Sequence, residues 1–338
     1  MNSFYDAIFH GLLGKENGRR ALFMFMVDQS EAMAEPWGRH RRSKLDGTVA
    51  GLNRMLIDMC RCYQHAAELA AAREGSFRRG GSRHLSRVSA PAYRERSRPP
   101  RISTGLLERT DDDRADLIDV GFIGYSDGSA GNGDGSLWVD EPEPDQFGFV
   151  RSVATLSMDR QRQMLDAVLE GGRPLPEVLA RVNESVQNWV DRHRLRSIPP
   201  IVINISSGAK PLDDRAADEL ICIREQGYGH EKDGDLSQVP DQPLLFFNCV
   251  LLNHKGLAPL LFPGMKELSG ANITDDKMVD MEYIRSLHLA SSPMPEVIKH
   301  YARKASKNLP HKVSFNSPTG FAFAKNIEGL DWFGRICN

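Results

Sequence analysis

One pattern near the start of the chain constrains its fold more than any other feature. The continuous apolar run at residues 21–27 stops abruptly at Asp28, and Ser30 follows two residues later. Hydrophobicity that is continuous rather than alternating indicates a strand buried on both faces, as in the centre of a parallel sheet. Polar residues that follow such a strand lie at the carboxyl edge of the sheet, where open α/β folds bind their ligands. The run by itself also fits an ordinary core strand followed by a capping Asp or Ser.

Further strand patterns recur along the chain. Apolar runs bounded by polar turns predict strands at residues 116–127, 199–208, 244–252 and 259–263. Residues 137–139 and 147–150 flank an acidic, Pro-rich turn, which predicts an edge hairpin.

Helical patterns lie between these strands. Ser43 has the side chain of an N-cap, and the helix that it precedes has apolar residues at spacings of three and four: Leu45, Val49, Leu52, Leu56 and Met59. A second long helix follows residue 176, with the stripe Leu179, Val182, Val186, Trp189 and Val190, and a shorter helix is predicted at residues 158–169. The alternation predicts an α/β fold with a doubly wound, mostly parallel central sheet and helices on both faces.

Composition narrows the class of protein. The chain has 338 residues and a formal net charge of -2 at pH 7, so its overall charge does not draw it to nucleic acid or to a membrane. The first residues lack the basic region and apolar core of a secretion signal, and no uncharged apolar run reaches the length of a membrane span. The five cysteines show no metal-site spacing. These features predict a cytoplasmic protein with no membrane partner. No cofactor is predicted, because no GxGxxG follows the first strand.

A basic segment interrupts the strand and helix patterns. Residues 73–101 contain nine arginines and two glutamates, which gives a local charge of +7. Such a segment cannot bury enough apolar surface to fold alone, so a flexible insert is expected at about residues 73–113. Two interpretations remain open: a solvated surface loop, or an element that binds polyanions. The candidate polyanion contacts are Arg78, Arg79, Arg83, Arg87, Arg94, Arg96, Arg98 and Arg101.

The residues at 28–33 resemble the metal-site motif of the von Willebrand factor A (VWA) family. That family opens its metal-ion-dependent adhesion site with Asp-x-Ser-x-Ser, usually followed by Met. Asp28, Ser30 and Met33 fit this motif, whereas Ala32 stands where the second Ser is expected.

Two later junctions carry the same resemblance. Gly-Gly-Arg-Pro at residues 171–174 is similar to the family's Gly-Gly-Thr-Pro, so Arg173 replaces a Thr ligand. Ser-Ser-Gly at residues 206–208 is similar to Thr-Asp-Gly at the end of the fourth strand, so Ser207 replaces an Asp ligand. The resemblance covers residues 22–207 apart from the basic insert.

The resemblance implies an adhesion site that has lost its metal. Of five ligand positions the chain keeps Asp28 and Ser30, and one carboxylate with two hydroxyls makes a poor cage for Mg²⁺. We therefore predict no metal at this site. Arg173 is expected to take the place of the cation by pairing with Asp28, with Ser30 and Ser207 as secondary partners. In the alternative interpretation, Arg173 points into solvent and Asp28 caps the turn.

The last third of the chain extends the resemblance to cytoplasmic bacterial VWA proteins of the tellurium-resistance-associated kind. The motifs are Leu-Phe-Pro at 261–263, the Ser-Ser-Pro-Met-Pro-Glu stretch at 291–296 and Gly-Phe-Ala-Phe at 320–323. The implied organisation is a lead-in at 1–20, a VWA domain at 21–262 and a helical extension, packed on that domain, at 263–338.

The implied function is that of a non-enzymatic adaptor in a bacterial stress or defence complex. The resemblance implies a kinase-like or phosphatase-like protein partner. It is expected to bind at the carboxyl edge of the sheet, at the positions Asp28, Ser30, Ala32, Arg173 and Ser207. A nucleic-acid-binding module that uses the Arg-rich insert is the alternative. A hydrolase is the third interpretation, and no base is assigned to activate a nucleophile for it.

Overall fold

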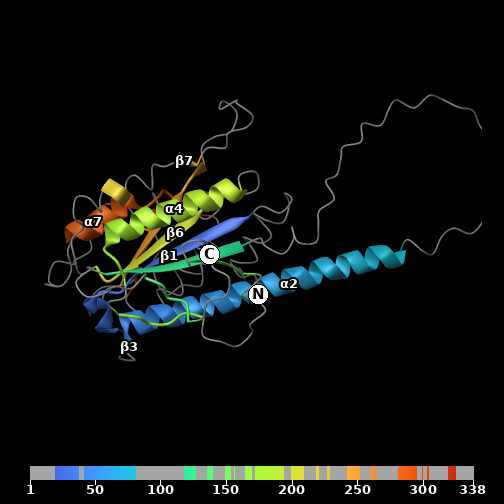
Figure 1. The fold of residues 1–338 in the computed structure, drawn as a ribbon, viewed down its shortest axis with the longest axis horizontal. Coiled ribbons are helices and arrows are strands. Elements are labelled where there is room, and N and C mark those ends of the chain that lie inside the picture. Colours follow the sequence, from blue (N-terminus) through green and yellow to red (C-terminus); the bar gives the residue numbers. More distant parts are fainter. Residues whose placement is uncertain are drawn as a thin grey trace, which may run out of the picture.

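The computed structural model describes residues 20–37, 42–80, 118–126, 135–139, 149–153, 156, 164–169, 172–193, 199–208, 218–220, 227–228, 242–251, 260–263, 281–294, 299, 303 and 319–324. These residues form a mostly parallel sheet with helices packed against it (Figure 1). The predicted α/β fold is therefore confirmed.

The central sheet has seven strands in the order β10-β11-β9-β6-β1-β4-β5. The strands are β1 (Ala21–Asp28), β4 (Ile118–Tyr125), β5 (Val150–Ser152), β6 (Ile201–Ser206), β9 (Leu245–Leu251), β10 (Leu260–Leu261) and β11 (Phe321–Ala324). Strands β5 and β10 are antiparallel to their neighbours, and the pairs between the other five are parallel. Two small antiparallel pairs lie outside this sheet: β2 (Pro36–Trp37) with β3 (Arg42–Ser43), and β7 (Gly227–Tyr228) with β8 (Gln242–Pro243).

Strand β1 lies inside the sheet between β4 and β6, where the order of the strands reverses. The chain passes from β1 to β4 on one side and later to β6 on the other. Asp28 pairs with Tyr125 of β4, and Val27 pairs with Ile205 of β6, so the carboxyl ends of the three strands lie level. In open α/β sheets, the crevice outside such a reversal is where ligands bind.

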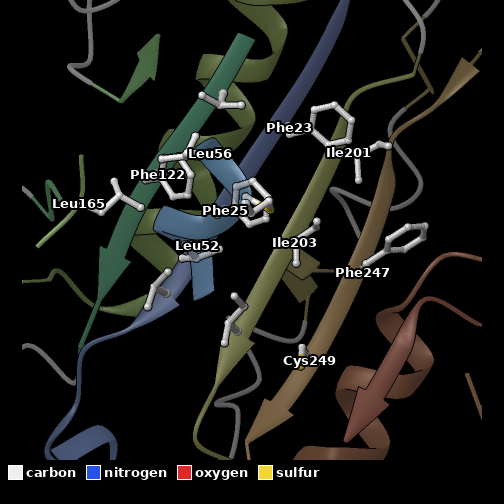
Figure 2. Close-up of a cluster of buried hydrophobic side chains, with 14 of the residues drawn as sticks. Phe23, Phe25, Leu52, Leu56, Phe122, Leu165, Ile201, Ile203, Phe247 and Cys249 are labelled. Carbon is white, nitrogen blue, oxygen red and sulfur yellow. The ribbon is translucent and has the colours of Figure 1, made fainter. Parts of the chain in front are cut away.

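Both faces of β1 are buried, which explains its unbroken apolar sequence. Phe23, Phe25 and Val27 belong to the cluster that packs against α2 (Lys44–Gly80). Figure 2 shows this face, where Phe25 and Phe122 stack with ring centroids 4.9 Å apart. The alternate residues Leu22, Met24 and Met26 belong to a second cluster, which contains residues of α4 (Leu175–His193) and α7 (Met281–Ala290).

Helix α2 starts as the sequence predicts. The Ser43 hydroxyl accepts a hydrogen bond from the Asp46 backbone N–H at 2.9 Å, as an N-cap does. The predicted apolar stripe from Leu45 to Met59 is buried in the core. The helix then continues to Gly80 and extends past the strands (Figure 1). Residues 73–80 are thus helical, although the sequence predicts a flexible insert from about residue 73. The rest of the expected insert lies outside the described residues.

Residues 164–169 are not helical, so the helix predicted at 158–169 is wrong there. Leu165 instead forms an antiparallel bridge with Trp138. The side chain of Asn53 on α2 holds this segment, because its Oδ1 accepts from the N–H groups of Met164 and Leu165 and its Nδ2 donates to the Leu165 carbonyl. The expected hairpin also differs, since β5 pairs with β4.

The C-terminal part of the chain contributes to the sheet itself. Strand β11 lies parallel to β9, with Phe321 opposite Asn248, and Gly320 packs closely on Phe247. The region expected as a helical extension therefore supplies a strand as well as α7. The lead-in expected at 1–20 lies outside the described residues except for Arg20. No helix in the described ranges is long and apolar enough to cross a membrane.

Candidate functional site

The candidate site lies at the carboxyl edge of the sheet, where β1, β4 and β6 end. The short helix η2 (Glu31–Ala34) follows β1 there, with Ser30 at its N-terminal boundary and Ala32 within it. The same edge carries Asp28, Ser207 and the segment that contains Arg173. The fold thus brings the predicted partner-binding positions to one edge, at the reversal of strand order.

Asp28 is buried, and both of its carboxylate oxygens accept hydrogen bonds from the protein. Oδ1 accepts from the Ser30 backbone N–H at 2.9 Å. Oδ2 accepts from the Ser207 N–H at 2.9 Å and from the Ser207 hydroxyl at 2.5 Å. Charge-assisted hydrogen bonds of this kind are stronger than neutral ones. Asp28 therefore joins the end of β1 to the end of β6.

The backbone around Arg173 is fixed on the other side of β4. The Ser126 hydroxyl donates to the Gly172 carbonyl at 2.7 Å, and the Ser126 N–H donates to the Arg173 carbonyl at 2.9 Å. Gly172 packs so closely on Tyr125 that a Cβ would overlap the Tyr125 backbone. Glycine is therefore needed at position 172 for this approach.

The Arg173 side chain pairs with Glu177, so the predicted pair with Asp28 is wrong. Arg173 Nη1 lies 3.3 Å from Oε2 of Glu177, which is in the first turn of α4. Asp28 lies on β1 and Arg173 beyond β4, a separation of about two strand spacings, or roughly 10 Å. In addition, Ser30 and Ser207 already occupy the carboxylate of Asp28.

The side chains at this edge do not fit a divalent cation. Magnesium prefers octahedral oxygen ligands and is usually bound through one or two carboxylates. Ala32 has no side-chain oxygen, and the Ser207 hydroxyl donates its proton to the only carboxylate among the five predicted positions. In the described part of the chain, no group of three or more His, Cys, Asp or Glu residues could hold a metal ion.

A buried polar chain beneath the edge was not predicted from the sequence. The Tyr125 hydroxyl donates to Asn204 Oδ1 at 2.9 Å, and Asn204 Nδ2 donates to Asn248 Oδ1 at 2.9 Å. Asn248 Nδ2 in turn donates to the Leu287 carbonyl at 3.1 Å and to the Ser291 hydroxyl at 2.9 Å. This series of hydrogen bonds links β4, β6 and β9 to α7. Its sequence signal is one Asn inside each of two otherwise apolar strands.

Two tyrosines lie close to Asp28 on this face of the sheet. Burial raises the pKa of Tyr125 well above its usual range, and the neighbouring Tyr283 and the charge of Asp28 act in the same direction. Burial also raises the pKa of Tyr283. Both phenols therefore stay protonated at neutral pH, where they serve as hydrogen-bonding groups rather than as bases.

Two of the eight candidate polyanion contacts, Arg78 and Arg79, lie far from this edge. Helix α2 begins near the carboxyl end of β1 and runs back along the sheet (Figure 1). At 37 residues it is roughly 55 Å long, so Arg78 and Arg79 lie at its distant end. The other six predicted arginines, from Arg83 to Arg101, lie outside the described residues.

Comparison with known proteins gave no identification. No family model matches the chain, and no curated protein matches it. The fold and the contacts at the carboxyl edge therefore carry the functional argument.

Proposed function

We propose that this chain is a VWA-like adaptor that binds a protein partner through the carboxyl edge of its sheet, without a metal ion and without catalysis. One observation carries the proposal: Ser30 and Ser207 together give three hydrogen bonds to Asp28. Asp28, which would bind the cation in a metal-dependent VWA domain, instead accepts hydrogen bonds from within the protein. The edge then serves as a preformed surface rather than as a coordination site.

The topology supports the doubly wound, VWA-like part of this proposal. From β5 through β4, β1, β6 and β9 to β11, the strands follow the doubly wound order 3-2-1-4-5-6, with β5 as an antiparallel edge strand. Fold alone does not define function, so the argument for binding rests on the edge. Glu31 and Glu177 are exposed there, and Arg173 is half-buried, which leaves charged groups available to a partner.

The resemblance to bacterial VWA proteins extends the proposal to the partner and the setting. A kinase-like or phosphatase-like protein in a cytoplasmic stress or defence complex is the proposed class of partner. The alternative, nucleic-acid binding, has one structural observation in its favour, since α2 places Arg78 and Arg79 well away from the proposed protein-binding edge.

Site-specific photo-crosslinking of the full chain in its host cell tests the proposal. A photoreactive amino acid at Glu31 probes the carboxyl edge, and the same residue at Asp191 is the matched control. Asp191 is exposed near the opposite end of α4, where Trp189 donates to Asp119 at the start of strand β4. A third position, Arg79, probes the far end of α2.

We expect a protein partner to cross-link at position 31 and not at position 191. Equal cross-linking at both positions, or none at position 31, would contradict the proposal. Cross-links at position 79 that disappear after nuclease treatment would favour the alternative. Binding that falls steeply with salt concentration would point in the same direction.

A further inference from the structure

Among the described residues, the guanidinium of Arg173 forms an ion pair with Glu177, and its Nη1 lies 3.3 Å from Glu177 Oε2. The backbone of Arg173 is fixed by Ser126 and by the packing of Gly172 on Tyr125. A guanidinium carries five N–H donors, and a carboxylate can engage two of them in a fork. Glu177 contacts Arg173 at Nη1, and Nε is buried with no hydrogen-bond partner in the described structure.

The contact between Arg173 and Glu177 is easily displaced. The side chains of Arg173 and Glu177 are 42% and 50% exposed, and the two residues are four apart in the sequence, with Glu177 in the first turn of α4. Exposed pairs of this geometry contribute little to stability, because water competes for both charges and salt screens them. A carboxylate from another molecule could therefore replace that of Glu177 at little cost.

The surroundings of Arg173 favour a negative charge for a second reason. Helix α4 begins at Leu175, two residues after Arg173, and runs for 19 residues. The first turn of such a helix carries partial positive charge, which stabilises carboxylates nearby. Glu177 lies in this first turn. Its carboxylate occupies the position that the local field favours for any anion.

We infer that the partner presents a carboxylate to Arg173, and that Glu177 occupies this guanidinium in the free protein as an internal competitor. This inference rests on the proposed function and specifies its partner: a protein segment with an exposed Asp or Glu. Binding replaces the Arg173–Glu177 contact by an intermolecular one that can use two donors of the guanidinium. By competing for Arg173, Glu177 lowers the affinity of the chain for acidic segments that make only one weak contact with the guanidinium.

The test uses the full chain labelled with ¹⁵N and a hexaglutamate peptide as the probe. The Nε–H resonance of Arg173 and the backbone amide of Ser126 report binding at this place, so peptide bound elsewhere on the chain does not interfere. Glu177→Gln removes the internal competitor. Asp191→Asn removes the same charge from the other end of α4 and is the matched control, and Arg173→Ala removes the proposed contact.

We expect the peptide to shift both resonances in the wild-type chain. Glu177→Gln should bind it about two- to five-fold more tightly, the range that corresponds to loss of an exposed ion pair, and Asp191→Asn should not. Arg173→Ala should abolish the shift at Ser126 with the fold intact by circular dichroism.

Two results would overturn the inference. One is an unshifted Arg173 Nε–H at saturating peptide, and the other is equal affinity of the Glu177→Gln and Asp191→Asn variants. A partner captured at position 31 whose affinity is unchanged in Arg173→Ala would also overturn it, while the proposed function would stand. Failure of capture at position 31 would remove the proposed function and this inference together.

Discussion

Ser207 donates both its backbone N–H and its hydroxyl to Oδ2 of Asp28, across 179 residues of sequence. Asp28 is the last residue of β1, and Ser207 directly follows β6. These two strands are neighbours in the sheet, at the point where the order of the strands reverses. A buried carboxylate is stable when donors surround it, and these contacts supply them together with the Ser30 N–H. The pair therefore fixes the geometry of the edge that we propose as the binding surface.

This geometry predicts different effects for the two serines beside Asp28. Ser207→Ala removes a side-chain donor to a buried charge and should lower the free energy of unfolding by about 1–3 kcal/mol. Ser30→Ala is the control, because Ser30 donates to Asp28 through its backbone N–H, which alanine retains. Urea unfolding followed by circular dichroism measures both. Equal losses in the two variants would show that the Ser207 hydroxyl does not support Asp28.

The second prediction concerns metal. Titration calorimetry of the wild-type chain with Mg²⁺ or Mn²⁺ should show no tight binding, because the oxygens of Asp28 are occupied and Ala32 cannot be a ligand. Micromolar affinity that is lost in Asp28→Ala would contradict this.

Restoring the ligand residues of the VWA family should allow the chain to bind Mg²⁺. In the triple variant Ala32→Ser, Arg173→Thr and Ser207→Asp, a second carboxylate would face the buried Asp28. Two carboxylates at such a distance repel unless a cation lies between them. We expect the unfolding temperature of this variant to rise with added Mg²⁺ and that of the wild-type chain to stay constant. The single variant Arg173→Thr should not gain this response.

The fourth prediction concerns the buried pair Asn204 and Asn248, both fully inaccessible to solvent. Asn248→Leu leaves Asn204 Nδ2 without its acceptor, and a buried polar group that loses its partner costs about 1–3 kcal/mol. The double variant Asn204→Leu/Asn248→Leu should be less destabilised than the sum of the single variants, since both partners of the bond are removed. The free energies of unfolding of the wild-type chain, the two single variants and the double variant complete this double-mutant cycle. Additive losses would mean that the two amides are not coupled.

The fifth prediction is a dependence of stability on alkaline pH. Burial on α2 raises the pKa of Cys60 from 9.0 to about 11. Between these values the unfolded chain loses the thiol proton while the folded chain keeps it, so the free energy of unfolding falls as pH rises. Cys60→Val removes this contribution. The difference in stability between the wild-type and variant chains should be constant below pH 9 and should change from about pH 9 to pH 11. A constant difference over the whole range would show that the thiol titrates normally.

Local patterns of hydrophobicity determined the central elements of this protein. Strands β1, β4, β6 and β9 follow from apolar runs, and α2 and α4 follow from apolar stripes with the helical period, because burial selects those side chains directly. The position of Asp28 and Ser207 at one edge also followed, since parallel strands bring their carboxyl ends together.

Tertiary contacts decided what these patterns could not. Residues 164–169 are not helical, and Asn53, more than 100 residues away, binds the backbone of Met164 and Leu165. Helix α7 and strand β11 were not predicted as parts of the sheet region, and their places depend on contacts with β9. The partner of Arg173 is the clearest case. An arginine at this position predicted an ion pair with a carboxylate at the edge. Arg173 pairs with Glu177 rather than Asp28 because β4 lies between Arg173 and Asp28, and because Ser30 and Ser207 already donate hydrogen bonds to Asp28. Those are properties of the assembled sheet, because hydrogen-bond donors from remote segments compete for one carboxylate only after the chain has folded.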